Sequence, residues 1–293
     1  MTAFKLQEFS KEQPKSSVIL PIFDGEKSPN YSRLLKELKS QTFQDFEVIV
    51  SAVSAPNGRA RNEGVTLAKG DYLIFIDETI YLPKETILEN LMRSFQSSEK
   101  VAVVGASCGP FPELNWIQRQ YFVSRGFYIP SVNKPSLNAR VQHGCMAVSK
   151  KVFQQVGWES DRLMTGTDND LLGRITRAGY EIMAVPDTHV FYEPPKSFAK
   201  ILKKSYVKGQ GSAFAFMIYP GLFEFSSHFK IKNSWSACLY KFLSTLSKFF
   251  QPWFWLRPVV LCCEVMICVG FISGCMKWSG QKPDLLRSDL RRS

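Results

Sequence analysis

Apolar and polar residues alternate along the first two thirds of the chain in blocks typical of strands and helices. Short apolar, often β-branched runs predict strands, and segments with apolar residues at helical spacing lie between them. The predicted strands cover residues 17–23, 46–50, 72–76, 101–104, 141–148, 180–185 and 188–192. The predicted helices contain Leu34, Leu35 and Leu38, or cover residues 60–68, 83–95, 150–156 and 168–178. This alternation indicates an α/β domain with a mainly parallel sheet and helices on both faces.

Two parts of the chain depart from this alternation. Residues 106–140 are rich in Pro, Gly and aromatic residues, and they predict a loop or insertion over one end of the sheet. The segment 258–276 is apolar apart from Glu264, and as a helix it would reach roughly 28 Å, barely enough to cross a bilayer core. We expect a transmembrane or re-entrant helix there. A helix lying in the membrane interface, or packed on the domain, is the alternative.

The distribution of charge favours a membrane partner. The formal net charge is +11, and residues 196–257 carry ten basic residues against Glu224 alone, whereas residues 1–195 are neutral. Such a stretch could bind nucleic-acid phosphates or the anionic face of a membrane. Aromatic residues and the apolar segment accompany it, and no nucleic-acid module does. The sequence therefore predicts membrane lipids, and no nucleic acid, as partners.

The cysteines and the N-terminus predict where the protein resides. Seven cysteines show no CxxC pairs and no metal-ligand spacing, and four of them lie inside the apolar segment. We expect them to be reduced, which suits a catalytic part in the cytoplasm. Residues 1–15 are polar and mixed in charge, so no signal peptide is expected there.

Acidic residues follow the third predicted strand. Ligands of open α/β sheets lie beyond the carboxyl ends of the strands, a rule that selects Asp77, Glu78 and Thr79. Asp168 and Asp170 lie at the start of a predicted helix, where the helix dipole alone can explain carboxylates. Carboxylates at such positions can hold a divalent cation or act as a general base.

A series of motifs resembles family-2 glycosyltransferases in order and spacing, over roughly residues 16–220. The motifs are SVILP at residues 17–21, QTFQDFEVIV at 41–50, GRARNEG at 58–64, AKGDYLIFIDET at 68–79, GCMAVSKKVF at 144–153 and TDNDL at 167–171. The resemblance implies a Rossmann-like GT-A fold and inversion at the anomeric carbon in one displacement. The expected organisation is an N-terminal extension (1–15), a GT-A catalytic domain (16–195), basic aromatic membrane-interface helices (196–257), the apolar helix (258–276) and a polar tail (277–293).

The resemblance also implies roles for individual residues. Asp77 matches the first acid of the family's DxD element, which contacts the donor and a divalent cation, Mg²⁺ or Mn²⁺. Asp168 matches the general base, and His189 lies where many members place a further metal or diphosphate ligand. The other donor-side residues would be Pro21, Arg61, Asn62, Glu78 and Thr79, and the acceptor-side residues would be Asp170 and Arg174.

Three positions depart from the family pattern. Thr79 replaces the second metal-binding Asp of the DxD element, and a neutral hydroxyl binds Mg²⁺ or Mn²⁺ less well. Residues 51–56 (SAVSAP) lack the acidic cluster that commonly reads the nucleotide base, and Thr167 replaces the Glu that commonly precedes the catalytic Asp. These departures weaken the expected metal site and alter the base pocket.

Two functional hypotheses follow. The first is an inverting glycosyltransferase at the cytoplasmic face of a membrane, which moves a sugar from a nucleotide-sugar donor to a lipid-linked or surface-polysaccharide acceptor. The second is a glycosyltransferase-like binding or scaffolding protein that has lost catalysis. Nucleotidyl transfer is disfavoured, because no glycine-rich basic loop follows the first strand.

Overall fold

The computed structural model describes residues 3–9, 11–52, 56–125, 128–137, 141–218 and 257–278. The chain divides into two compact units. The first covers residues 1–113, 127–162 and 170–193 and contains the sheet; the second covers residues 114–126, 163–169 and 194–293. Much of the predicted interface segment (219–256) and of the predicted tail (279–293) lies outside the described residues.

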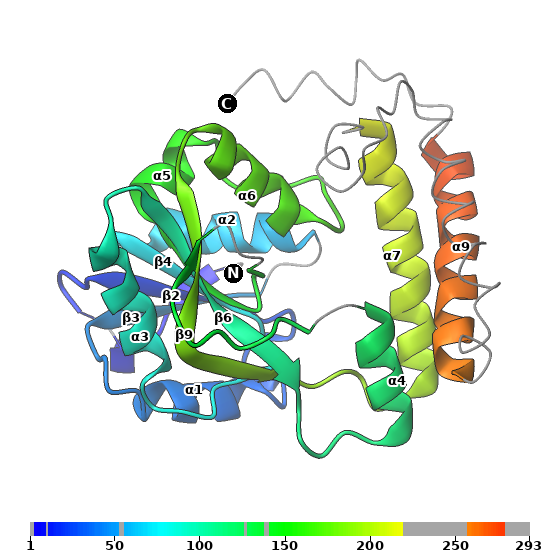
Figure 1. The fold of residues 1–293 in the computed structure, drawn as a ribbon, viewed down its shortest axis with the longest axis horizontal. Coiled ribbons are helices and arrows are strands. Elements are labelled where there is room, and N and C mark those ends of the chain that lie inside the picture. The colour runs from blue at the N-terminus through cyan, green and yellow to red at the C-terminus, as the bar shows by residue number, and fades with distance from the viewer. Residues whose placement is uncertain are drawn as a thin grey trace. The chain divides into compact units, whose positions relative to one another are not determined.

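The described strands of the first unit form one nine-stranded sheet, in the order β1-β3-β2-β4-β8-β6-β9-β5 with β7 paired to β9 (Figure 1). The strands are β1 (Ala3–Lys5), β2 (Ser16–Pro21), β3 (Phe46–Ser51), β4 (Tyr72–Ile76), β5 (Ile80–Tyr81), β6 (Val101–Pro110), β7 (Ser136–Leu137), β8 (Cys145–Ser149) and β9 (Glu181–Tyr192). The helices are α1 (Tyr31–Lys39), α2 (Asn57–Leu67), α3 (Ile87–Ser94), α5 (Lys150–Gln155) and α6 (Thr167–Arg177), whose first three residues belong to the second unit. Short 3-10 helices lie at Gln7–Phe9, Gly25–Lys27 and Phe95–Ser97.

The sheet is mixed, where the sequence predicted a mainly parallel one. β2 pairs in parallel with β3 and β4, and β6 with β9, whereas β8 lies antiparallel between β4 and β6. The chain between β6 and β8 returns to the same end of the sheet without a crossover, so β8 enters in the opposite direction.

Three segments differ from their predicted structure. β1 pairs antiparallel with β3, so the N-terminal residues contribute a strand to the sheet. β6 continues to Pro110, and helix α4 (Trp116–Arg125) and β7 occupy much of the predicted loop at 106–140. β9 is one twelve-residue strand where two were predicted. Pro186 and Asp187 suggested a turn, and Asp187 does take a positive φ of 54°, but pairing with β6 continues past it after a register shift.

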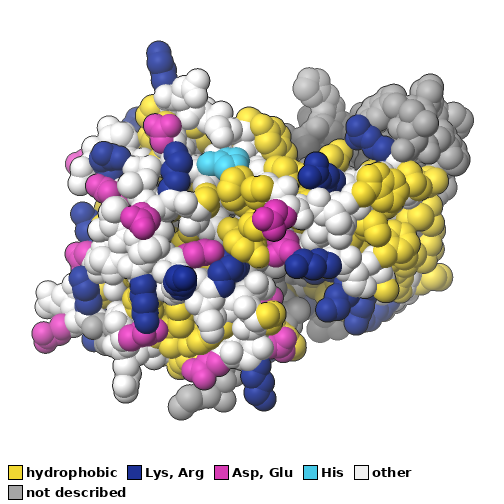
Figure 2. Space-filling view, turned by 90° about the horizontal axis from the view of Figure 1, so that it is seen from below, with side chains coloured by type: hydrophobic (Ala, Val, Ile, Leu, Met, Phe, Trp, Pro, Cys, Tyr) yellow, Lys and Arg dark blue, Asp and Glu magenta, His cyan; other side chains and the backbone are white. Residues whose placement is uncertain are grey.

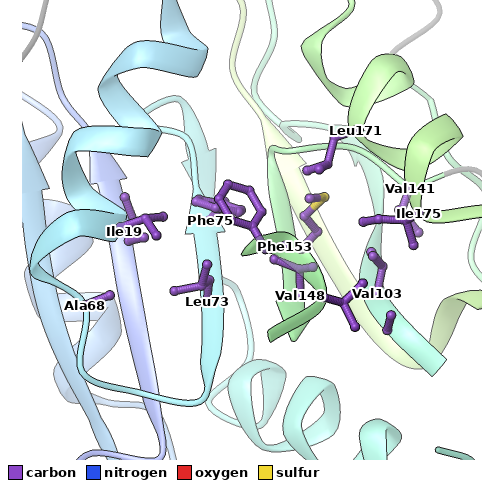
Figure 3. Packing of buried hydrophobic residues seen from close by; sticks show 14 of the residues in the cluster. Ile19, Ala68, Leu73, Phe75, Val103, Val141, Val148, Phe153, Leu171 and Ile175 are labelled. Atoms are coloured by element: carbon purple, nitrogen blue, oxygen red, sulfur yellow. The ribbon is translucent and has the colours of Figure 1, made fainter. Parts of the chain in front are cut away.

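Apolar side chains from the sheet and from α2, α5 and α6 form the core (Figure 3). Phe75 on β4 and Phe153 on α5 are fully buried, with ring centroids 5.8 Å apart. Leu171 and Ile175, one turn apart on α6, are also fully buried in this cluster. This packing fixes the carboxyl end of β4, where the predicted donor site begins.

A buried carboxylate fixes the opposite end of β4. Glu47 on β3 accepts hydrogen bonds from Ser17 Oγ (2.8 Å), the Lys69 backbone N–H (2.6 Å) and Lys5 Nζ (2.5 Å). Ser17 Oγ in turn accepts the Gly70 N–H at 2.9 Å. Burial alone would raise the pKa of Glu47, but these donors outweigh it and the pKa lies below its ordinary value. The turn that leads from α2 into β4 is therefore anchored by charge-assisted hydrogen bonds.

The described part of the second unit consists of α4, residues 163–169, α7 (Phe198–Ile218) and α9 (Pro258–Trp278). α7 and α9 run in the same direction side by side (Figure 1). A Cβ on Gly270 would meet the Tyr206 carbonyl oxygen at 2.0 Å, and one on Gly274 would meet the Ala213 Cβ at 2.8 Å. The rings of Phe214 and Trp278 lie 4.9 Å apart. Contacts between residues 206 and 270, 210 and 274, and 214 and 278 thus set the register.

Glycine is required where the two helices meet, so Gly270→Leu should separate them. We expect amide hydrogen exchange in α7 and α9 to become faster while the β-sheet keeps its protection, because the added side chain collides with backbone. Hydrogen exchange followed by mass spectrometry measures this, with Val269→Leu as the control because Val269 is exposed on the same helix. Unchanged protection in Gly270→Leu would contradict the packing described.

Candidate active site

Asp77 lies directly beyond the carboxyl end of β4. Its backbone N–H donates to the Gly144 carbonyl at 3.1 Å, and its carbonyl accepts the Ile80 N–H at 3.0 Å, so the residue opens a tight turn. Its side chain is 34% exposed. β4 is buried along Leu73 to Ile76, and the anchored strand presents this carboxylate at a fixed position at its end.

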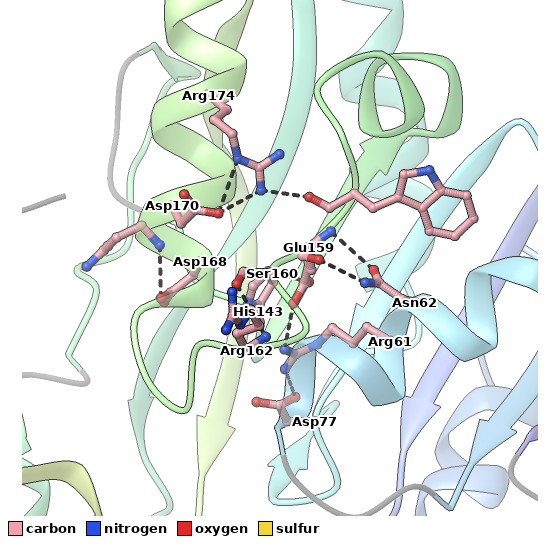
Figure 4. A network of polar contacts seen from close by, with 12 residues as sticks. Arg61, Asn62, Asp77, His143, Glu159, Ser160, Arg162, Asp168, Asp170 and Arg174 are labelled. Carbon is pink, nitrogen blue, oxygen red and sulfur yellow. Dashed lines mark hydrogen bonds and ion pairs between the residues drawn. The ribbon is translucent and has the colours of Figure 1, made fainter. Parts of the chain in front are cut away.

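A buried arginine holds Asp77 in place. Arg61 Nη2 lies 2.7 Å from Asp77 Oδ1, and Arg61 Nη1 lies 3.3 Å from Glu159 Oε2 (Figure 4). The Arg61 side chain is only 2% exposed. Gly58, one turn earlier on α2, lets the helix approach the 159–160 segment, since a Cβ there would lie 2.1 Å from the Ser160 carbonyl oxygen. Helix α2 therefore brings one guanidinium between two carboxylates.

Glu159 is fully buried on the far side of Arg61. His143 Nε2 lies 2.9 Å from Glu159 Oε1. The Asn62 side chain clamps the Glu159 backbone, donating to its carbonyl at 2.8 Å and accepting its N–H at 3.1 Å. Burial alone would raise the pKa of Glu159, but the charges of His143 and Arg61 outweigh it and hold the pKa below its ordinary value. The carboxylate stays ionised and supports Arg61.

Glu78 and Thr79 lie in the turn between β4 and β5. Glu78 Oε2 accepts from Ser28 Oγ at 3.0 Å, and its carbonyl accepts from Arg33 Nη2 at 2.8 Å. The Thr79 carbonyl accepts the Glu193 N–H at 3.1 Å, which ties the turn to the end of β9. Pro21 ends β2 beside Ser51, the last residue of β3. These residues all lie at or beyond strand ends, as the strand-end rule requires.

His189 lies on β9, and its hydrogen bonds set its tautomer. Ser107 Oγ donates its single hydrogen to the Thr188 carbonyl at 2.9 Å, so at its 2.9 Å contact with His189 Nδ1 it must accept. The hydrogen of a neutral His189 is therefore on Nδ1, which leaves the Nε2 lone pair available as a ligand. Burial, and then the charge of Lys84, lower the pKa of His189, which favours the neutral ring.

The sequence-predicted acceptor-side residues make contacts within their own segment. Asp168 is half-buried at the start of α6, and its Oδ1 accepts the Asn169 N–H at 3.0 Å. Arg174 donates to Asp170 Oδ2 at 2.7 Å and to the Trp158 carbonyl at 2.6 Å, and it also donates to the Val156 carbonyl. Through these bonds Asp170 and Arg174 fix the segment that leads to Glu159.

The described residues provide no ready-made metal cage. No group of three or more His, Cys, Asp or Glu side chains among them could hold an ion. Asp77 and His189 offer at most two ligands, and one Asp77 oxygen already faces Arg61. Mg²⁺ commonly takes one or two carboxylates and completes its shell with phosphate oxygens and water, so an ion held by either residue would take most of its ligands from a bound diphosphate.

Sequence reasoning missed His143 and Glu159. Both lie in loops, and nothing in their spacing distinguishes them from exposed polar residues. The one local sign is Gly157, which takes a φ of 90° and is followed by Trp158 at 62°. Such a left-handed pair turns the chain sharply just before Glu159.

Comparison with known proteins identifies the class of protein. The structure resembles the mannosyltransferase PcManGT from Pyrobaculum calidifontis in complex with GDP-Man and Mn²⁺, with a TM-score of 0.54 and 12% identity over 92% of this chain and 88% of that one. This likeness shows the fold, which is GT-A, as predicted.

The sequence comparisons indicate the activity. Residues 19–157 match the model of glycosyl transferase family 2, and this match, together with two curated relatives, indicates that the protein is a glycosyltransferase. It is 22% identical to a dolichyl N-acetyl-alpha-D-glucosaminyl phosphate 3-beta-D-2,3-diacetamido-2,3-dideoxy-beta-D-glucuronosyltransferase of Methanococcus voltae, over 73% of this chain and 68% of that protein. It is also 22% identical to glycosyltransferase AglE of Haloferax volcanii, over 71% of this chain and 67% of that protein.

Glu159→Gln should lower the free energy of unfolding at neutral pH and make that free energy depend less on pH in the acidic range. A carboxyl group whose pKa is lowered in the folded state stabilises the fold above its unfolded pKa of about 4.3, and this contribution is lost as the pH falls through the folded value. Removing one partner of a buried ion pair costs about 3–5 kcal/mol at neutral pH. Urea unfolding between neutral and acidic pH measures both effects.

The matched control for this substitution is Glu99→Gln, at an exposed glutamate. It should leave the unfolding free energy and its pH profile as they are in the unsubstituted protein. A Glu159→Gln profile parallel to that of the unsubstituted protein would show that Glu159 carries no lowered pKa.

Proposed function

We propose that the protein is an inverting glycosyltransferase that moves a sugar from a nucleotide-sugar donor to a lipid-linked or surface-polysaccharide acceptor. The observation that carries the donor part is Asp77, a part-exposed carboxylate fixed at a strand end by the buried Arg61. Preorganised charge of this kind is what a site for a nucleotide diphosphate requires. Pro21, Asn62, Glu78 and Thr79 would complete the donor side.

In the proposed reaction Asp168 is the general base. It accepts the proton of the acceptor hydroxyl while that oxygen attacks the anomeric carbon, and the bond from that carbon to the nucleoside diphosphate breaks. A single displacement of this kind inverts the anomeric configuration. The hydrogen bond from the Asn169 N–H orients the Asp168 carboxylate at the N-terminus of α6. Asp170 and Arg174 would act on the acceptor side by fixing the adjacent segment.

A divalent cation, Mg²⁺ or Mn²⁺, belongs to this proposal, and the Mn²⁺ in the PcManGT complex supports it. When bound, the ion would neutralise charge that develops on the leaving diphosphate. Asp77 and the Nε2 atom of His189 would hold it. The hydrogen bond between His189 Nδ1 and Ser107 Oγ keeps the imidazole ring in the tautomer whose Nε2 lone pair can bind a metal ion.

Membrane association supports the lipid-linked acceptor. Among the described residues, α9 is the one helix that is both long enough and apolar enough to cross a membrane. Membrane lipids are therefore proposed partners. The Methanococcus voltae relative is named for a dolichyl phosphate-linked sugar. We place the catalytic unit on the cytoplasmic side, because activated sugars are made there.

Asp168→Asn should abolish transfer while leaving the donor bound. General bases contribute about 10²–10⁴-fold to rate, so we expect kcat to fall by that factor with little change in donor affinity. Asn169→Ala is the control at the exposed neighbouring position and should keep near-normal turnover. Full turnover in Asp168→Asn, measured by release of nucleoside diphosphate, would disprove its role as the base.

Titration calorimetry with a panel of nucleotide sugars tests the donor site. We expect one donor to bind more tightly with Mn²⁺ than without it, and Asp77→Asn to remove that gain because the ion loses a charged ligand. Asp71→Asn, at an exposed residue just before β4, should keep the gain. Binding of no donor under either condition would favour a protein that has lost catalysis.

A further inference from the structure

The outer face of α9 carries a continuous apolar stripe. Val265, Val269, Ile272 and Met276 are 42%, 48%, 49% and 70% exposed. Their spacing of four, three and four residues places them on one side of the helix. The other side packs on α7 through Gly270 and Gly274. Among the described residues, only the face of α9 opposite the stripe is covered by a neighbouring helix.

Exposed apolar side chains are concentrated in the second unit. Among the described residues, eight large hydrophobic side chains with high exposure lie in that unit and four in the larger first unit. Besides the four residues of the stripe, they include Trp116 and Val123 on α4. Figure 2 shows a broad yellow surface at the right of the view, over the part of the chain that contains α7 and α9, with Lys and Arg side chains next to it.

The register of the helix pair places lysines beside the middle of α9. Because residue 206 lies level with 270 and residue 210 with 274, Lys200 is level with residue 264, Lys204 with 268 and Lys208 with 272. The midpoint of α9 is residue 268. Lys200, Lys203 and Lys204 are exposed. The described part of α7 contains no acidic residue.

A membrane-spanning α9 would carry these lysines into the bilayer. Its midpoint would lie at the bilayer centre, and the exposed ammonium groups of α7 would lie at the same depth. Charged side chains are costly there and are rare outside water-filled cavities. A helix pair with lysines along one side and an apolar stripe along the other instead fits the boundary between headgroups and acyl chains.

We infer that the α7–α9 pair lies in the plane of the membrane surface and does not span the bilayer. The occupant of the apolar stripe is a lipid bilayer with anionic headgroups. The stripe contacts the acyl chains, and the lysines of α7 remain at the level of the phosphates and water, to which they are attracted. This inference concerns how the protein meets the membrane and does not depend on the proposed chemistry of sugar transfer.

Depth measurement along α9 separates the two arrangements. A fluorescent amino acid replaces Val265, Val269 or Met276 singly in the full chain, which is then bound to phosphatidylglycerol-containing vesicles. The lipids are brominated either near the headgroup or near the end of the acyl chain. We expect stronger quenching by the shallow bromine at all three positions, to a similar degree. A spanning helix would instead give the deepest position at 269 and a shallow one at 276, and that result would overturn the inference.

The label at Lys203 is the matched comparison, since it lies at the level of residue 267 on the opposite helix. We expect it to be quenched weakly by either lipid, whereas a spanning pair would make it as deep as the label at 269. Labels that remain unquenched at every position, or protein that does not float with the vesicles, would assign the stripe to a protein partner and overturn the inference. Retained sugar transfer by each labelled protein confirms that it is folded.

Discussion

The guanidinium of Arg61 is shared by two carboxylates that lie far apart in the sequence, and the position of Asp77 in the proposed donor site depends on it. One carboxylate, Glu159, is fully buried, so it is tolerable only because Arg61 and His143 compensate its charge. The other, Asp77, is part-exposed and free to meet a ligand. Arg61 itself cannot leave this position without stranding a buried negative charge. The buried ion pair of Arg61 and Glu159 thus holds the part-exposed Asp77 carboxylate in a fixed position.

The mixed sheet places the remaining groups around this edge. β8 lies between β4 and β6, and its preceding residue, Gly144, accepts the Asp77 N–H. β6 carries Ser107, which orients His189 on the neighbouring β9. Burial, and then the charge of Asp77, raise the pKa of the Cys108 thiol to about 12, so the carboxylate acts electrostatically as far as the residue next to Ser107. The Cys108 thiol is therefore protonated and unreactive at neutral pH.

Much of this was accessible from the sequence, because periodicity reports burial. The apolar run 72–76 and the acid that follows it predicted β4 and a carboxylate at its end, and the resemblance of the motifs to family-2 glycosyltransferases implied the GT-A fold. What the sequence did not reveal depends on partners distant along the chain. The direction of β8 depends on how a long connection returns, and the burial of Glu159 depends on Arg61, 98 residues earlier. The continuity of β9 was hidden by Pro186 and Asp187, which read as a turn but are accommodated by a register shift. Gly270 and Gly274 of α9 are explained only by the α7 backbone that faces them in the structure.

The close approach of α7 and α9 has a practical consequence for anyone who shortens the protein. A truncation before residue 258 is the obvious way to obtain a soluble catalytic fragment. It would remove the surface that covers Gly209 and Ala213 of α7, where a Cβ at Gly209 would lie 2.1 Å from the Ile267 carbonyl oxygen. The face of α7 that packs on α9 would then expose backbone and apolar atoms to water, and such a surface promotes self-association. A soluble fragment therefore has to end before α7 begins at Phe198, because a chain that keeps both helices also keeps the apolar stripe of α9.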